Sequence, residues 1–109
     1  MSNNPVLSRL GFVRKAGKMS IGFNKSKEAC EKGISRLIVV ASDVSLKSEK
    51  EIRFYNKDKA AVIRLPFALE ELSAAIGIRA GILSVNDDGF AESIIKVLKE
   101  INTAPEQLS

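Results

Sequence analysis

The segment Arg36-Leu37-Ile38-Val39-Val40-Ala41-Ser42 contains a continuous apolar run that is rich in β-branched residues. Such a run is typical of a central strand that is covered on both faces. Helices should therefore flank the sheet, and helical and strand patterns alternate along the rest of the chain. This alternation predicts an α/β fold, a three-layer α/β/α sandwich with a mostly parallel or mixed sheet of about four strands.

The elements before this strand follow from apolar spacing and from glycine positions. Helical spacing predicts a first helix that runs up to Ala16. A short strand or extended segment follows at residues 19–22. A second helix is predicted at residues 24–32, with Asn24 as its N-cap and Gly33 as its C-terminal stop.

After the central strand, Ser45 is expected to cap a third helix. Its apolar side is predicted to comprise Leu46, Ile52, Phe54 and Tyr55. The remaining elements are a second core strand at 61–65, a fourth helix at 67–76, a third core strand at 80–85, and a last helix with an apolar stripe from Phe90 to Ile101. We expect one domain over residues 1–109, with loosely held tails at 1–4 and 103–109.

The residue inventory excludes several classes of function. The chain has no histidine and one cysteine, Cys30, so it excludes histidine-based catalysis, intramolecular disulfides and zinc sites built on Cys and His spacing. Cys30 is expected to be a small packing residue within a helix. Apolar runs are too short for a membrane span and the N-terminus lacks the apolar core of a signal peptide, so we expect a cytosolic, cytoplasmic protein.

Other candidate motifs have simpler interpretations. Gly17 and Gly22 have the spacing of P-loop glycines, but the Lys and the Ser or Thr of that motif are missing from their positions. Asp87 and Asp88 are better explained as caps of the last helix than as a metal or acid pair. Asp43 follows the central strand, where α/β proteins place ligands, although a turn or capping role is the simpler interpretation.

Charge is distributed unevenly along the chain. Residues 1–36 hold eight Lys or Arg against two acids, a net charge of +6. The net charge is +2 over residues 37–64 and −4 over residues 65–109. A basic first third combined with an acidic last third favours one localised polyanion site, as in a nucleic-acid-binding protein.

The second predicted helix carries Lys25 and Lys27 in its first turn. The helix dipole makes this end partly positive, so a cation here costs about 0.3–1 kcal/mol. The two later helices instead begin with the acidic pairs Glu70-Glu71 and Asp87-Asp88. A bound phosphate would offset the penalty, which indicates an anion site at the start of the second helix.

The loop between the fourth helix and the third core strand combines glycines with Ile76, Ile78 and Arg79. An exposed apolar side chain beside an arginine can support an unstacked base. Alternatively, both isoleucines turn inward around a simple turn.

Three segments resemble the kink-turn-binding ribosomal protein family of the L-seven-Ae and L-thirty-e type. They are Gly22-Phe23-Asn24-Lys25-Ser26-Lys27-Glu28-Ala29, Glu31-Lys32-Gly33, and the stretch from Arg36 to Val44. The third helix, Lys47 to Tyr55, looks like the eukaryotic L-thirty-e branch, and the resemblance covers most of residues 6–100. It implies a bacterial ribosome-associated or stand-alone member with the same α/β/α sandwich.

The resemblance also implies a set of RNA contacts. Gly22 and Asn24 would approach the sheared G·A pairs of a kink-turn, and the loop at Ile78 would meet its flipped-out nucleotide. Asn suits base edges because its amide both donates and accepts. The RNA-binding residues implied are Gly22, Asn24, Lys25, Lys27, Glu28, Lys32, Arg36, Ile78, Arg79 and Ala80.

Two segments depart from the family pattern. Archaeal members usually carry Glu directly after the Asn and Lys four positions after it, whereas this chain has Lys25 and Glu28. Ser73-Ala74 replaces a Gly-Lys pair in the fourth helix. We expect a non-enzymatic, monomeric RNA-binding protein that needs no cofactor or metal, with RNA and ribosomal proteins as partners. A protein-interaction module that uses the acidic C-terminal third is the alternative.

Overall fold

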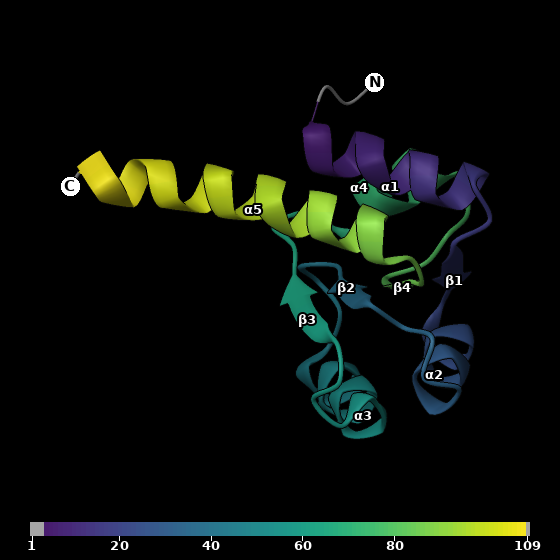
Figure 1. The fold of residues 1–109 in the computed structure, drawn as a ribbon. Helices are drawn as coiled ribbons and strands as arrows, with labels where there is room; N and C mark the ends of the chain where they lie inside the picture. The colour runs from purple at the N-terminus through teal and green to yellow at the C-terminus, as the bar shows by residue number, and fades with distance from the viewer. Residues whose placement is uncertain (1–3, 109) are drawn as a thin grey trace.

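Helices and strands alternate along residues 4–108, the part of the chain that the computed structural model describes; side chains are described for residues 4–100. The elements are α1 (Pro5–Lys15), β1 (Met19–Ile21), α2 (Phe23–Glu31), β2 (Leu37–Val40), α3 (Leu46–Asn56), β3 (Ala61–Arg64), α4 (Leu69–Ile76), β4 (Ile82–Val85) and α5 (Asp88–Leu108) (Figure 1). Each predicted element is present, with shifted boundaries.

The strands form one mixed sheet in the order β1-β4-β2-β3. Strands β2 and β3 are parallel, whereas β4 is antiparallel to both β1 and β2. All four residues of β2 are fully buried, which confirms that it is covered on both faces. The predicted mixed sheet is therefore confirmed for the described residues.

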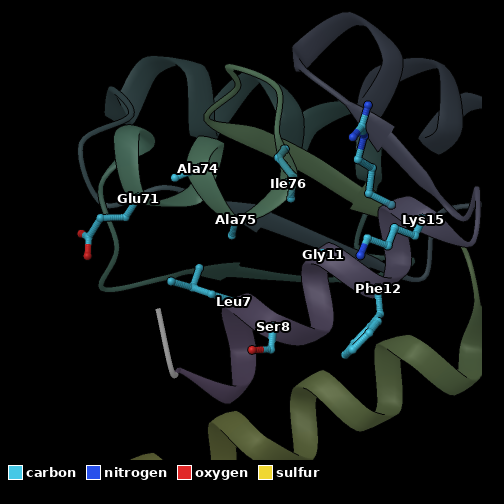
Figure 2. A pocket seen from close by; sticks show the side chains of 10 residues that line it. Leu7, Ser8, Gly11, Phe12, Lys15, Glu71, Ala74, Ala75 and Ile76 are labelled. Atoms are coloured by element: carbon cyan, nitrogen blue, oxygen red, sulfur yellow. The ribbon is translucent and has the colours of Figure 1, made fainter. Parts of the chain in front are cut away.

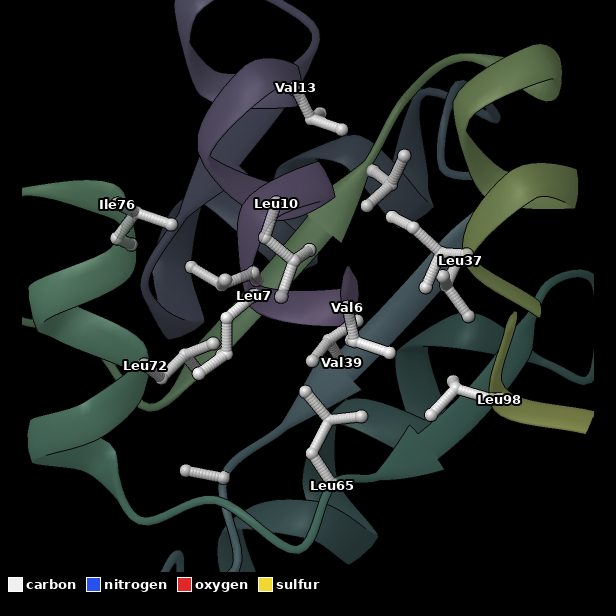
Figure 3. Close-up of a cluster of buried hydrophobic side chains, with 14 of the residues drawn as sticks. Val6, Leu7, Leu10, Val13, Leu37, Val39, Leu65, Leu72, Ile76 and Leu98 are labelled. Carbon is white, nitrogen blue, oxygen red and sulfur yellow. The ribbon is translucent and has the colours of Figure 1, made fainter. Parts of the chain in front are cut away.

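Alternate side chains of β2 enter two separate cores. Leu37 and Val39 join the larger cluster with α1, α4 and α5 (Figure 3). Ile38 and Val40 join a smaller cluster with Cys30 of α2 and Ile52 of α3. Helices thus cover both faces of the sheet, and the predicted three-layer sandwich is confirmed (Figure 1).

Two predictions about buried surfaces are wrong. Strand β3 has partly exposed side chains, because it stands last in the strand order and has a neighbour on one side only. On α3, Ile52 is buried, but Leu46 and Phe54 are 70% and 71% exposed. Because the buried face of α3 is narrow, these two apolar side chains point away from the core.

Helix α4 begins at Leu69 and not at Phe67. The N–H of Leu69 donates to Asp43 Oδ1 at 2.8 Å, and the N–H of Ala68 donates to Glu71 Oε1 at 3.1 Å. Asp43 therefore caps α4, a helix distant from it in sequence, in place of the local role that we expected. The cap joins the end of β2 to the start of α4.

Other predicted caps are confirmed. Ser45 Oγ accepts from the N–H of Ser48 at 3.1 Å, and Asp87 Oδ2 accepts from the N–H of Phe90 at 2.9 Å. Cys30 is 6% exposed, so it packs as expected, and burial raises the pKa of its thiol.

The predicted tails are described only in part. Residues 1–3 and 109 lie outside the described residues. The backbone of α5 continues to Leu108, so the segment from 103 to 108 is helical, and its loose attachment stays a prediction. Among the described residues, no helix combines the length and the apolar composition needed to cross a bilayer.

Candidate nucleic-acid interface

Helix α2 begins at Phe23 and not at Asn24, and Gly22 is its N-cap. Gly22 has φ 92° and ψ 168°, a conformation that is essentially restricted to glycine. The preceding residue, Ile21, pairs with Leu83, and the N–H of Gly22 donates to the carbonyl of Ile82 at 2.8 Å. This pairing forces the chain to turn at residue 22. Asn24 becomes the second helical residue, with an exposed side chain that caps nothing.

The start of α2 differs from every other helix start in the described part of the chain. A side-chain oxygen accepts from an N–H group at the beginning of each other helix: Asn4 for α1, Ser45 for α3, Asp43 and Glu71 for α4, and Asp87 for α5. Helix α2 has no side-chain cap and no acid in its first turn. Its N–H groups and the exposed Lys25 thus present positive charge together.

The loop at residues 77–81 leads directly to Ile82, whose carbonyl accepts the hydrogen bond from the N–H of Gly22. The Ser73 hydroxyl holds this loop against α4, because it accepts from the N–H of Ala80 at 3.0 Å and donates to the carbonyl of Ala80 at 3.3 Å. Ile78 is 40% exposed, whereas Ile76 is buried. The inward-turned alternative therefore holds for Ile76 alone.

The two other predicted loop residues have different surroundings. Arg79 Nη1 lies 3.2 Å from Glu70 Oε1 in an exposed ion pair. Ala80 is 8% exposed, so its side chain contributes little surface to a ligand. Within this loop, Ile78 and Arg79 are the predicted residues with accessible side chains.

The predicted cations do not form one cluster. Lys27 faces α3, where its Nζ lies 4.4 Å from the centre of the Tyr55 ring. Arg36 precedes β2 at the opposite end of the sheet from Gly22, since Leu37 pairs with Val85. There Arg36 pairs with Asp88 at 3.0 Å and donates to the carbonyl of Gly33 at 2.9 Å. Lys32 lies at the C-terminal end of α2, so only Lys25 stands at the helix start.

A hollow that sequence reasoning missed adjoins both the start of α2 and the end of the 77–81 loop. Its volume is about 360 Å³, and it is lined by Phe23, Val44, Ser48, Glu51, Leu69, Gly81 and Ile82. A Cβ at Gly81 would lie 2.7 Å from Val44 Cγ2, so glycine allows the close approach here. Gly81 could have indicated a close approach from the sequence, but the residue that it approaches, Val44, is known only from the fold.

A second hollow of about 400 Å³ lies between α1 and α4 (Figure 2). One of its lining residues, Arg14, reaches the base of the 77–81 loop, because its Nη1 would lie 3.3 Å from a Cβ at Gly77. Sequence reasoning missed this cation, since contact between α1 and α4 depends on tertiary packing. No group of three or more His, Cys, Asp or Glu side chains in the described residues could hold a metal ion.

Comparison with known proteins provides the family. No family model matches the chain. Large ribosomal subunit protein eL30 of Candida glabrata is 30% identical over 87 residues, which span 77% of this chain and 83% of that protein. The chain belongs to the kink-turn RNA-binding ribosomal protein family.

Other relatives agree with this family. The eL30 protein of Saccharomyces cerevisiae is 26% identical over 84% of this chain and 90% of its own length. Large ribosomal subunit protein eL8 of Cenarchaeum symbiosum is 28% identical over 84% of this chain and 75% of its own length. The family relationship thus covers most of the chain.

Two solved structures share the fold. A protein of unknown function from Bacillus halodurans has a TM-score of 0.81 at 22% identity and covers 87% of this chain and 97% of its own. The 15.5kD RNA binding protein of Giardia lamblia has a TM-score of 0.73 at 12% identity, with 94% and 92% covered.

Glu28 lies between two cations on the exposed side of α2. Its carboxylate is 4.0 Å from Lys25 Nζ and 3.9 Å from Lys32 Nζ. All three side chains are substantially exposed, so these long ion pairs contribute little to stability. Their main effect is to reduce the positive potential along the exposed side of α2.

Proposed function

We propose that this chain is a non-enzymatic RNA-binding protein that recognises kink-turn-like RNA. The observation that carries the proposal is the uncapped start of α2, which stands beside the end of the 77–81 loop. A phosphate at this point would accept from the free N–H groups and meet the charge of Lys25. Family membership favours RNA as the source of that phosphate.

The accessible residues have distinct roles in the proposal. Gly22 lacks a side chain, so a base pair can approach the backbone closely. The Asn24 amide reads base edges, because it can donate and accept at once. Ile78 offers an apolar surface to an unstacked base. Lys32 and Arg36 extend the phosphate contacts toward the far end of α2.

The proposed natural target is ribosomal RNA, in the cytoplasm and with ribosomal proteins as neighbours. Support comes from the relatives, which are named as large ribosomal subunit proteins. The exchanged charges at Lys25 and Glu28 favour a target that differs in detail from a standard kink-turn, since lysine cannot accept from a guanine amino group.

The test compares two RNAs across a salt series: a kink-turn, and the same RNA with its G·A pairs replaced. We expect tighter binding of the intact kink-turn, and an affinity that falls as salt rises. Asn24→Ala should reduce the preference for the kink-turn, whereas Lys25→Ala should weaken binding of both RNAs and lower the salt slope. Lys96→Ala, on α5, is the matched control and should bind as the unchanged protein does.

Two results would overturn the proposal at different levels. Equal affinity for both RNAs would exclude recognition of the kink-turn structure. Absence of binding to either RNA at low salt would exclude RNA binding and leave the protein-interaction alternative.

A further inference from the structure

Helix α3 carries a basic stripe that is separate from the start of α2. Lys47, Lys50 and Phe54 are spaced three or four residues apart, so they share one helical face, and Lys57 follows as the C-cap of the helix. All four are exposed, and the stripe runs about 15 Å along the helix axis. No ion pair involves its three lysines among the described side chains, so their charge is directed to solvent.

Phe54 stands in the middle of this stripe. The residue is 71% exposed, and one neighbouring ring, that of Tyr55, packs against it. The centre of the Tyr55 ring lies 5.3 Å away at an interplanar angle of 83°, and Tyr55 in turn meets Phe23 at 6.5 Å. Lys27 also contacts the Tyr55 ring and helps to fix it. Phe54 therefore offers an aromatic surface that the described side chains leave largely uncovered.

A hollow of about 410 Å³ adjoins Phe54. It is lined by Cys30, Glu31, Phe54, Tyr55, Lys57 and Lys59. The turn that bears these lysines contains Lys57 at φ 52° and Asp58 at φ 59°, two consecutive non-glycine residues in the left-handed region. Such a turn is energetically unfavourable for L residues, and here it places two lysines beside the exposed ring.

We propose that the α3 stripe binds a single-stranded RNA segment, with a base stacked on Phe54 and phosphates held by Lys47, Lys50, Lys57 and Lys59. A protein surface of this kind needs a ligand that is both anionic and aromatic, which single-stranded nucleic acid supplies along its whole length. An acidic protein segment would satisfy the lysines but offer no regular stacking partner. The site lies beyond the kink-turn interface and does not depend on it.

The test uses a single-tryptophan reporter, because the chain has no tryptophan of its own. Phe54→Trp is titrated with a twelve-nucleotide oligoadenylate, which cannot form G·A pairs. We expect saturable quenching of its fluorescence as adenine stacks on the introduced indole. With four lysines engaged, affinity should fall about fifty-fold between about 50 and 200 mM salt. Circular dichroism establishes that the variant is folded.

The matched control is Phe12→Trp on α1, a site that is 60% exposed and adjoins Lys15 in the hollow of Figure 2. The fluorescence of this control variant should not respond to the oligonucleotide. In the otherwise unchanged chain, Phe54→Ala should weaken oligoadenylate binding about five- to a hundredfold, and it should leave binding of inorganic polyphosphate unchanged. The Asn24→Ala variant should bind oligoadenylate normally, which separates this site from the kink-turn interface.

Three results would overturn the proposal. They are no quenching in Phe54→Trp at low salt, equal quenching in Phe12→Trp, and unchanged oligoadenylate affinity in Phe54→Ala. The first would leave the stripe to a protein partner, and the other two would reduce it to non-specific attraction between lysines and polyanions.

Discussion

Glu28 shows how one side chain can set the potential of a helix surface. It lies 3.9–4.0 Å from Lys25 and Lys32, at distances that give weak, solvent-screened pairs. Removing its charge should therefore affect a bound polyanion more than it affects folding.

Glu28→Gln is expected to raise RNA affinity several-fold at low salt, because repulsion of phosphates is lost. The stability change should stay below about 1 kcal/mol. Binding across a salt series and thermal unfolding measure the two effects. Glu92→Gln on α5 makes the same change in net charge at a distant exposed site. An equal gain in that control would mean that overall charge, and not position, is responsible.

Glu49, unlike the exposed Glu28, is a largely buried carboxylate that lies between two arginines and stabilises the fold. Its oxygens accept from Arg53 Nε at 2.9 Å and from Arg64 Nε at 2.8 Å. Arg64 also donates to the carbonyl of Val44 at 2.9 Å, so the group ties α3 to the turn after β2. Burial alone would raise the pKa of Glu49, but the hydrogen bonds and charges of the two arginines outweigh it, and the pKa is lowered.

Because the pKa of Glu49 is lower in the folded than in the unfolded protein, its charge stabilises the fold at pH values above the unfolded pKa of about 4.3. This stabilisation is lost as the pH falls through the lower pKa of the folded protein. Glu49→Gln should therefore cost about 1–3 kcal/mol at pH 7, and the difference from the unchanged protein should shrink in acid. Urea unfolding at about pH 7 and pH 3 measures it. Glu51→Gln, an exposed neighbour on the same helix, should show neither effect; a constant difference at both pH values would contradict the assignment.

At the scale of elements, the turn from β1 into α2 depends on one backbone conformation. Gly22 has φ 92° and ψ 168°, whereas Gly33 at the other end of α2 has φ 73°. Asparagine tolerates the ordinary left-handed region, but the conformation of Gly22 admits essentially glycine alone. Nothing lies within 4 Å of a Cβ at either position, so the difference between them is a backbone effect.

Gly22→Asn should destabilise the protein by about 1–3 kcal/mol, whereas Gly33→Asn should cost less than about 1 kcal/mol. Denaturant unfolding measures the loss of unfolding free energy in both variants, provided that the dependence on denaturant concentration is unchanged. Equal costs at the two ends of α2 would show that Gly22 relaxes into an ordinary helix cap when it is replaced.

These elements also show what could be predicted from the sequence. The buried strand β2 and the caps Ser45 and Asp87 follow from local composition, and the structure confirms them. The N-terminal boundary of α2 could not be predicted from local composition. Pairing of β1 with β4 fixes the turn at Gly22, and this overrides the preference of Asn24 for the N-cap position. Exposure of Phe54 was missed because the buried face of α3 is narrower than the apolar spacing in the sequence suggests.

Two parts of the candidate site, the start of α2 and the 77–81 loop, could be predicted from the sequence by their charge and glycine content. Their meeting point could not, because the Gly22–Ile82 hydrogen bond joins residues far apart in the chain. Arg14 beside Gly77 was missed for a similar reason, as was the displacement of Arg36 to the opposite end of the sheet.

At the scale of the whole molecule, the two cores are unequal. The cluster under α1, α4 and α5 is the larger, whereas α2 and α3 share a smaller cluster that includes Cys30. Because local opening free energy falls as the amount of buried apolar surface decreases, the α2–α3 layer should open before the rest of the molecule unfolds.

Cys30 provides a measurement of that opening. Its buried thiol, with a raised pKa, should react with a thiol reagent only when α2 lifts from the sheet. The opening free energy from labelling should be lower, and less dependent on denaturant, than that of global unfolding. Coincident values would show that both layers unfold as one cooperative unit.

The strand order β1-β4-β2-β3 has a consequence for the protein while it is being made. Strand β1 pairs with β4, the last strand in the chain. The turn at Gly22 is therefore held in place only once β4 has been synthesised. A nascent chain exposes its basic first third on the translating ribosome long before that pairing can form. If the proposed function holds, ordered recognition of RNA would wait until β4 has emerged, and products truncated before β4 would carry the basic charge without the proposed site.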